Sequence, residues 1–149
     1  MKNLANVVYS KLLYGQDKKI AAIIVNIIDI CNYDCYYCYN KKPRTSMMLD
    51  LDKLFAFIQW FMDNINNNII LFILGGEPTL HPQLFDFCKK IRLTYPNNVN
   101  CRIVTNFSYL LHKTIELLEY GVQMNASWHS LPNDRYNKQF IEKIDKIPS

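Results

Sequence analysis

Three cysteines, Cys31, Cys35 and Cys38, follow one another closely in a chain of 149 residues that contains five cysteines. Thiolates are soft ligands, so three of them on one loop can hold zinc or an iron–sulfur cluster. A cluster with three protein ligands keeps one coordination position for a molecule that is not protein. The spacing therefore predicts a metal centre that binds a further ligand.

Two other interpretations of the three cysteines stay open. Spacings of four and three residues can place small buried side chains on one face of a helix. The neighbours oppose a helix, because Asn32, Asp34 and the four tyrosines between positions 33 and 39 favour a loop. Structural zinc needs four ligands, and Cys88 and Cys101 lie at no paired spacing. The ligand number and softness thus favour an iron–sulfur cluster over zinc and over buried thiols.

Two apolar runs lead into the residues that could do chemistry. Residues 20–30 precede the cysteines, and residues 69–74 precede the turn Gly75-Gly76-Glu77-Pro78. Aliphatic runs with little alternation are typical of strands that are buried on both faces of a parallel sheet. We therefore expect the cysteines and the Gly-Gly-Glu-Pro turn at the ends of two neighbouring strands, although such a turn can also be a plain β-α connection.

The rest of the chain continues the alternation of strands and helices. Further strands are expected over residues 101–105 and 122–128, and helices over about 50–65 (capped by Asp50), 81–95, 109–120 and 133–147. This order predicts an α/β fold, a parallel sheet of about four β-α units with right-handed crossovers. Ligands of such sheets bind at the carboxyl ends of the strands.

Polar residues follow the third and fourth expected strands at that same edge. Asn106 closes the third strand, and Ser127 and His129 lie at the end of the fourth. Each has an alternative role: Asn106 can cap a helix, Ser127 can be a plain strand-end residue, and His129 can be structural. As an acid or base, His129 would suit substrate chemistry, because unperturbed histidine titrates near neutral pH.

Four other reactive side chains are assigned no role in chemistry. His81 and His112 lie in helical context and are interpreted as non-catalytic, while Cys88 and Cys101 are expected in the core. A ligand role for these two thiols would need neighbours at metal-binding spacing, which the sequence lacks.

Composition sets broad limits on the protein. Half of the residues are hydrophobic, and 149 residues fit one domain, with residues 1–19 as an N-terminal lead-in and 20–149 as the β-α units. The net charge of +4 is spread along the chain, so no nucleic-acid partner is expected. We find neither a signal-peptide pattern nor about 20 consecutive apolar residues, and therefore expect a cytoplasmic protein without a membrane partner. Because cysteines stay reduced in the cytoplasm, we expect metal ligation rather than disulfides.

The C-x-x-x-C-x-x-C spacing, with Tyr37 before the last cysteine and Gly75-Gly76-Glu77-Pro78 after the next strand, resembles the radical S-adenosylmethionine (radical SAM) superfamily. The resemblance implies that Cys31, Cys35 and Cys38 ligate a [4Fe–4S] cluster, whose fourth iron is chelated by S-adenosylmethionine (SAM).

The same resemblance implies roles for the other residues at the predicted edge. Tyr37 would lie near the adenine of SAM, and the loop from Gly75 to Pro78 would meet the methionine ammonium, which suits backbone carbonyls and the Glu77 carboxylate. Asn106 and Ser127 would contact the methionine carboxylate or the ribose.

As a radical SAM enzyme, the protein would cleave SAM reductively and abstract hydrogen from a substrate. The electron would come from an external one-electron reductant of the flavodoxin or ferredoxin type. The sequence Cys-Tyr-Tyr-Cys-Tyr-Asn resembles members that modify peptides or proteins more than members that act on small metabolites. A non-catalytic iron–sulfur electron carrier or cluster-binding module, and a zinc-stabilised interaction domain, stay open as alternatives.

This chain also departs from the family that it resembles. The family core is a partial TIM-type barrel of six β-α units, and this chain has room for about four, so an incomplete barrel is expected. Either the sheet edge is covered by a second copy or a partner protein, or the chain is a fragment that needs a partner.

Overall fold

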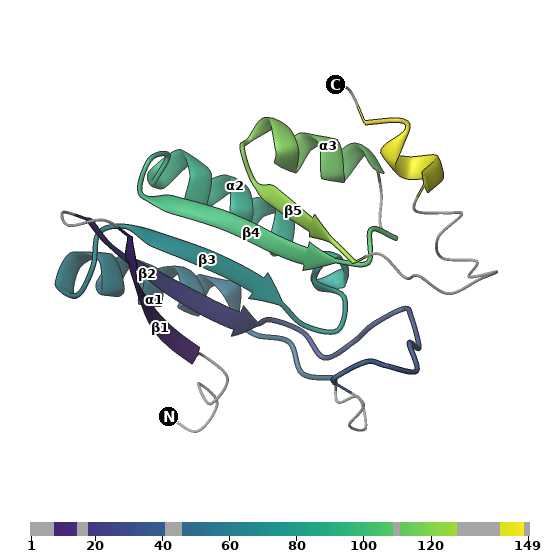
Figure 1. The fold of residues 1–149 in the computed structure, drawn as a ribbon, viewed down its shortest axis with the longest axis horizontal. Coiled ribbons are helices and arrows are strands. Elements are labelled where there is room, and N and C mark those ends of the chain that lie inside the picture. The colour runs from purple at the N-terminus through teal and green to yellow at the C-terminus, as the bar shows by residue number, and fades with distance from the viewer. Residues whose placement is uncertain (1–7, 15–17, 41–45, 109–110, 128–140, 148–149) are drawn as a thin grey trace.

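The computed structural model describes residues 8–14, 18–40, 46–108, 111–127 and 141–147. One sheet, with the strand order β1-β2-β3-β4-β5, forms the middle of the molecule (Figure 1). The strands are Val8–Tyr14 (β1), Lys18–Asn26 (β2), Ile69–Leu74 (β3), Val99–Thr105 (β4) and Gln123–Ala126 (β5). The helices are Leu51–Asn64 (α1), Leu84–Thr94 (α2) and Leu111–Glu119 (α3), with a 3₁₀ turn at Pro78–Leu80 (η1). No helix among the described residues has the length and apolar character to cross a membrane.

Strands β2 to β5 pair in parallel, and a helix follows each of the first three of them. This arrangement confirms the predicted α/β fold of four parallel strands. The sheet does not close on itself, because β1 and β5 form its two edges, in agreement with a partial TIM-type barrel. The carboxyl ends of β2, β3, β4 and β5 therefore share one edge, where the sequence places its unusual loops.

No strand or helix was expected before residue 20, but the structure contains β1 in this region. This strand runs antiparallel to β2, with Val8 opposite Ile24 and Tyr14 opposite Lys18. Its sequence, VYSKLLY, lacks a strict alternation, so pairing with β2 rather than a local pattern determines its conformation.

The other elements agree with the prediction apart from their ends. β3 has the predicted bounds, while α2 begins three residues later than expected, because Pro78 opens η1 and a turn at His81 separates η1 from α2. Of the helix expected at 133–147, residues 133–140 lie outside the described residues, and a helical turn is present at 141–144.

The core lies between the sheet and the helices behind it in Figure 1. Along β3 and β4 every second residue is buried, as expected when one face of each strand packs against helices. The buried side chains of α1 and α2 repeat at helical spacing and fill this layer: Leu51, Leu54, Ile58, Phe61, Leu84, Phe87, Cys88 and Ile91. Asp50 caps α1 as predicted, since its Oδ1 accepts the N–H groups of Asp52 (3.1 Å) and Lys53 (3.2 Å).

Cys88 and Cys101 lie in this core, as the sequence predicted. Their Sγ atoms are 3.8 Å apart between α2 and β4, and both residues are fully buried. Burial raises the pKa of the Cys88 thiol well above its usual value, so it stays protonated. The two side chains therefore pack as small apolar groups, and the protonated Cys88 thiol is unsuited to bind a metal.

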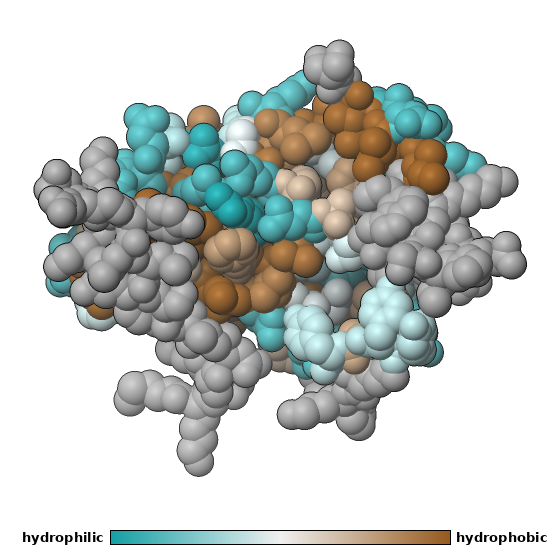
Figure 2. Space-filling view, viewed as in Figure 1, coloured by the Kyte–Doolittle hydropathy of each residue, from teal (hydrophilic) through white to brown (hydrophobic). Residues whose placement is uncertain are grey.

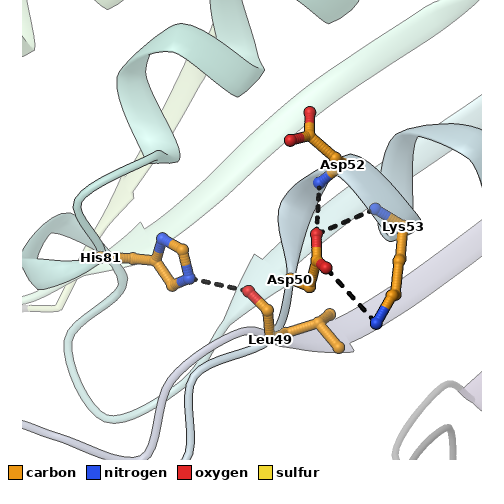
Figure 3. A network of polar contacts seen from close by, with 5 residues as sticks. All are labelled: Leu49, Asp50, Asp52, Lys53 and His81. Carbon is orange, nitrogen blue, oxygen red and sulfur yellow. Dashed lines mark hydrogen bonds and ion pairs between the residues drawn. The ribbon is translucent and has the colours of Figure 1, made fainter.

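His81 ties the turn after β3 to the start of α1 (Figure 3). It lies between η1 and α2 rather than within a helix, and it is buried. Its Nδ1 accepts the Gln83 N–H at 3.2 Å, so its Nε2 donates to the Leu49 carbonyl oxygen at 2.9 Å. Burial lowers the pKa of His81, and the Leu49 hydrogen bond opposes this shift only in part. The geometry gives His81 a structural role.

We predict that the stability of the protein falls as the pH decreases below about 6.5, the pKa of histidine in an unfolded chain. Because the folded protein holds His81 neutral with a lowered pKa, the unfolded state binds the proton more strongly in this range. Urea unfolding between pH 7.5 and 5 would measure the slope. His81→Gln should flatten this slope, because it removes the group whose pKa is lowered in the folded protein. A wild-type slope in His81→Gln would contradict the assignment.

Candidate functional site

The loop after β3 lies against the backbone that leads from β2 into the cysteines. The N–H of Gly76 donates to the Ile28 carbonyl at 2.7 Å, and the N–H of Glu77 donates to the Ile30 carbonyl at 2.9 Å. A Cβ atom on Gly75 would lie 2.5 Å from the Ile28 oxygen, and one on Gly76 would lie 2.3 Å from the Ile30 oxygen. Both positions thus require glycine, because any side chain would collide with backbone atoms.

The N–H groups of Gly76 and Glu77 in this loop form hydrogen bonds within the protein, but not all of its carbonyl groups do. Among the described residues, no donor reaches the carbonyl oxygen of Gly75 or of Gly76, whereas the Glu77 and Pro78 carbonyls accept the N–H groups of Leu80 and His81. Two backbone acceptors beside the cysteine segment are therefore available to a ligand with N–H donors.

The Glu77 carboxylate joins the loop after β3 to the end of β4. Its Oε1 accepts hydrogen bonds from the Thr79 N–H (3.1 Å), the Thr79 hydroxyl and the Thr105 hydroxyl (2.7 Å). Its Oε2 accepts the Asn106 N–H at 2.7 Å. The side chain is buried, so these donors replace the water that the charge would otherwise need. The sequence predicted Glu77 at the site but gave no sign of this structural role.

Asn106 joins the end of β4 to the cysteine loop. Its Nδ2 donates to the Asn32 Oδ1 at 3.0 Å and lies 3.9 Å from the Cys31 Sγ, and its Oδ1 accepts the Ser108 N–H at 2.9 Å. The Asn32 Nδ2 in turn donates to the Ser108 Oγ at 2.7 Å. The structure therefore brings the first cysteine, the loop after β3 and the end of β4 together, as the shared sheet edge predicted.

The three cysteines lie on one stretch beyond β2, each half-buried, and none forms a disulfide with another described residue. The Cys31 Sγ accepts the Tyr33 N–H at 3.4 Å, and the Cys38 N–H donates to the Cys35 carbonyl at 3.0 Å, which turns the chain between them. Within the described residues, the thiols do not yet converge into a metal-binding group.

The donor set of this loop fits an iron–sulfur cluster. It offers three half-buried thiols, and in the described part of the chain no other three Cys, His, Asp or Glu side chains are gathered into a competing metal site. N–H groups directed at Sγ, as at Cys31, are the contacts that tune cluster sulfur atoms. The loop is anchored at its first cysteine, through the contacts of Asn106 with Asn32 and Cys31.

The remaining predicted residues have separate placements. Tyr37 is half exposed, and its ring lies 4.8 Å from the Tyr36 ring in an edge-to-face pair. The Ser127 N–H donates to the Thr105 carbonyl at 2.8 Å, which places Ser127 beside the end of β4. His129 lies outside the described residues.

Two residues at the edge were missed by the sequence analysis. Phe107, directly after Asn106, has a positive φ of 60°, a backbone conformation that residues other than glycine rarely adopt. Its carbonyl accepts a hydrogen bond from Lys143 Nζ at 3.1 Å. Burial lowers the pKa of Lys143, while the charge of Glu77 opposes this shift. The segment 141–147 thus reaches the carboxyl edge, which no local pattern around a single lysine could indicate.

The family model of the radical SAM superfamily matches residues 25–147 of the chain. Among curated proteins, a GTP 3′,8-cyclase of Sulfurovum sp. (strain NBC37-1) is 32% identical over 126 residues, which are 80% of this chain and 37% of the relative. A GTP 3′,8-cyclase of Aliarcobacter butzleri is 29% identical over 137 residues, 89% of this chain and 40% of the relative. The chain spans less than half the length of these relatives. No solved structure gives a significant match.

These findings confirm the resemblance drawn from the cysteines and the Gly-Gly-Glu-Pro loop. The relatives named above are GTP 3′,8-cyclases, and these names state no peptide or protein substrate.

Gly76→Ala should destabilise the protein by about 3 kcal/mol, because the new Cβ collides with the backbone before Cys31. Urea unfolding would measure the loss, and alkylation with iodoacetamide should show faster modification of the cysteine loop. Glu119→Ala, on an exposed residue at the end of α3, is the control and should change neither quantity. Equal stability of Gly76→Ala and wild type would contradict the close approach.

Asn106→Ala should cost about 1 kcal/mol of stability and make the Cys31 thiol more reactive, because it removes the donor shared by Asn32 Oδ1 and Cys31 Sγ. Mass spectrometry of partially alkylated protein would give the rate for each cysteine. Asn97→Ala, on an exposed residue after α2, should change neither quantity. If Cys31 reacts at the wild-type rate in Asn106→Ala, Asn106 does not anchor the loop.

Proposed function

The chain belongs to the radical SAM superfamily, and from this premise we propose that it binds a [4Fe–4S] cluster through Cys31, Cys35 and Cys38 and cleaves SAM reductively. One observation carries the proposal. The Gly75-Gly76 loop is hydrogen-bonded to the segment that leads into Cys31, so the cluster ligands and the loop expected to bind SAM form one unit.

Bound by Cys31, Cys35 and Cys38, the cluster would supply the electron for reductive cleavage of SAM and so the means to abstract hydrogen from substrate. The protein contributes binding and orientation. The carbonyls of Gly75 and Gly76, which lack other described donors, would accept hydrogen bonds from the methionine ammonium.

Glu77 would act at the same ammonium through its charge, because both of its oxygens already accept hydrogen bonds within the protein. We assign Pro78 to fixing the turn, since it opens η1 directly after Glu77. Tyr37 would stack on the adenine with its exposed ring, while Asn106 and Ser127 would meet the carboxylate or ribose from the ends of β4 and β5.

A second candidate function is more specific, and it rests on sequence identity. Since relatives about 30% identical are GTP 3′,8-cyclases, we propose a purine nucleotide as the substrate rather than a peptide. The matched region is only 37% of the first of these relatives, so turnover of a nucleotide by this chain is part of the proposal.

The partners follow from the same chemistry and from the open sheet. An external one-electron reductant of the flavodoxin or ferredoxin type would supply the electron. Strand β5 is an edge of the sheet, and we propose that a second copy or a partner protein pairs with or covers it. A non-catalytic electron carrier is the competing function, but a carrier has no use for two ligand-accessible carbonyls beside its cluster.

Anaerobic reconstitution with iron and sulfide, followed by dithionite and SAM, should yield 5′-deoxyadenosine from the wild-type chain. Cys35→Ala should lose both the cluster and this product, because a ligand is removed. Cys88→Ala is the matched control, since it removes a buried thiol that takes no part in the site. Liquid chromatography and iron analysis give the readouts, and a fully loaded wild-type cluster that forms no 5′-deoxyadenosine would exclude the enzymatic function.

A further inference from the structure

The face of the sheet turned away from α1 and α2 carries no helix among the described residues (Figure 1). On β3 and β4 the residues between the buried ones are only half-buried, so they point to this second face, which we call the helix-free face. Figure 2 shows polar side chains lying among apolar ones there. The residues that line its middle come from β2, β3, β4 and β5: Ile24, Phe72, Arg102 and Gln123.

Arg102 lies in the middle of this face and is held in place by two neighbours. Its Nε donates to the Asn100 Oδ1 at 3.1 Å, one pleat back along β4. Its guanidinium lies 5.5 Å from the centre of the Phe72 ring, directly across the β3–β4 pair. The guanidinium is oriented by stacking on the aromatic ring and by one hydrogen bond from Nε. Its two outer nitrogens keep their N–H groups available.

Arg102 has no carboxylate partner among the described residues. The ion pairs between described residues lie on the outer surfaces of the helices, and the cation in each of them is a lysine. Its described neighbours on the helix-free face are aromatic, aliphatic or amide side chains. An oriented, half-buried guanidinium without a counter-charge is a site for a bidentate oxyanion.

The position of Arg102 along β4 limits the size of the ligand. It lies three residues before Thr105, the end of the strand, which corresponds to about 10 Å at the usual rise per residue. An oxyanion at Arg102 can therefore belong to a molecule whose other end lies at the carboxyl edge, where the cysteine loop and the Gly75-Gly76 loop meet. A nucleoside triphosphate is long enough to reach across this distance, and a small organic acid is not.

We propose that Arg102 binds the phosphate groups of a nucleotide substrate that lies along the helix-free face with its reacting carbon at the carboxyl edge. The proposal deepens the proposed function and rests on it, because the reaction is expected at that edge. It assigns substrate specificity to a mid-strand residue outside every motif of the sequence. Phe72 and Asn100 act as positioning residues for the guanidinium.

Titration calorimetry on the complete 149-residue chain tests this proposal without SAM or reductant. Wild type should bind GTP and inorganic triphosphate, and citrate should bind much more weakly. Arg102→Gln should weaken GTP binding at least tenfold, and Arg102→Lys should weaken it less, because lysine keeps the charge but not the bidentate geometry. Lys53→Gln removes the same charge from an exposed position on α1 and should bind like wild type.

Four results would overturn the proposal: no binding of GTP by wild type, wild-type affinity in Arg102→Gln, an equal loss in Lys53→Gln, or citrate binding as tight as triphosphate. Circular dichroism checks that each variant is folded, and Arg102→Lys decides the question if Arg102→Gln is not. Because no cluster chemistry enters the assay, a failure of SAM cleavage and a failure of phosphate binding give separate results.

Discussion

The buried carboxylate of Glu77 is the constraint on which the arrangement of the edge depends. A charge at 1% exposure must be matched by donors, and the donors come from Thr79 in its own loop and from Thr105 and Asn106 at the end of β4. Satisfying this one group therefore fixes the end of β4 relative to the loop after β3. The same loop contacts the backbone before Cys31 through the two glycines, so three strand ends are held together.

The strands and helices around the site were largely predictable, because each depends on local patterns. The aliphatic run of β3, the Asp50 cap of α1 and the alternation of β and α elements all have signatures within a short window. β1 has no such signature, since its conformation depends on pairing with β2. The sequence indicated candidate site residues by type and position, but it could not indicate their contacts. The bond from Asn106 to Asn32 joins residues 74 positions apart, and Lys143 reaches Phe107 from the far end of the chain.

The proposed site and the helix-free face are two parts of one surface. The carboxyl edge supplies the soft ligands and the backbone acceptors, while the sheet below it supplies an oriented cation and an aromatic ring. The relatives span more than twice the matched length. We propose that the helix-free face forms the floor of the substrate site and that the carboxyl edge holds the cofactor.

A [4Fe–4S] cluster held by three cysteines would leave one coordination position, and we propose that SAM fills it. Electron–nuclear double resonance on the anaerobically reconstituted and reduced chain, mixed with SAM labelled with ¹⁵N at the amino group, tests this directly. The account predicts a ¹⁵N coupling to the reduced cluster that appears only with labelled SAM. A normal [4Fe–4S] signal with no such coupling at saturating SAM would contradict it.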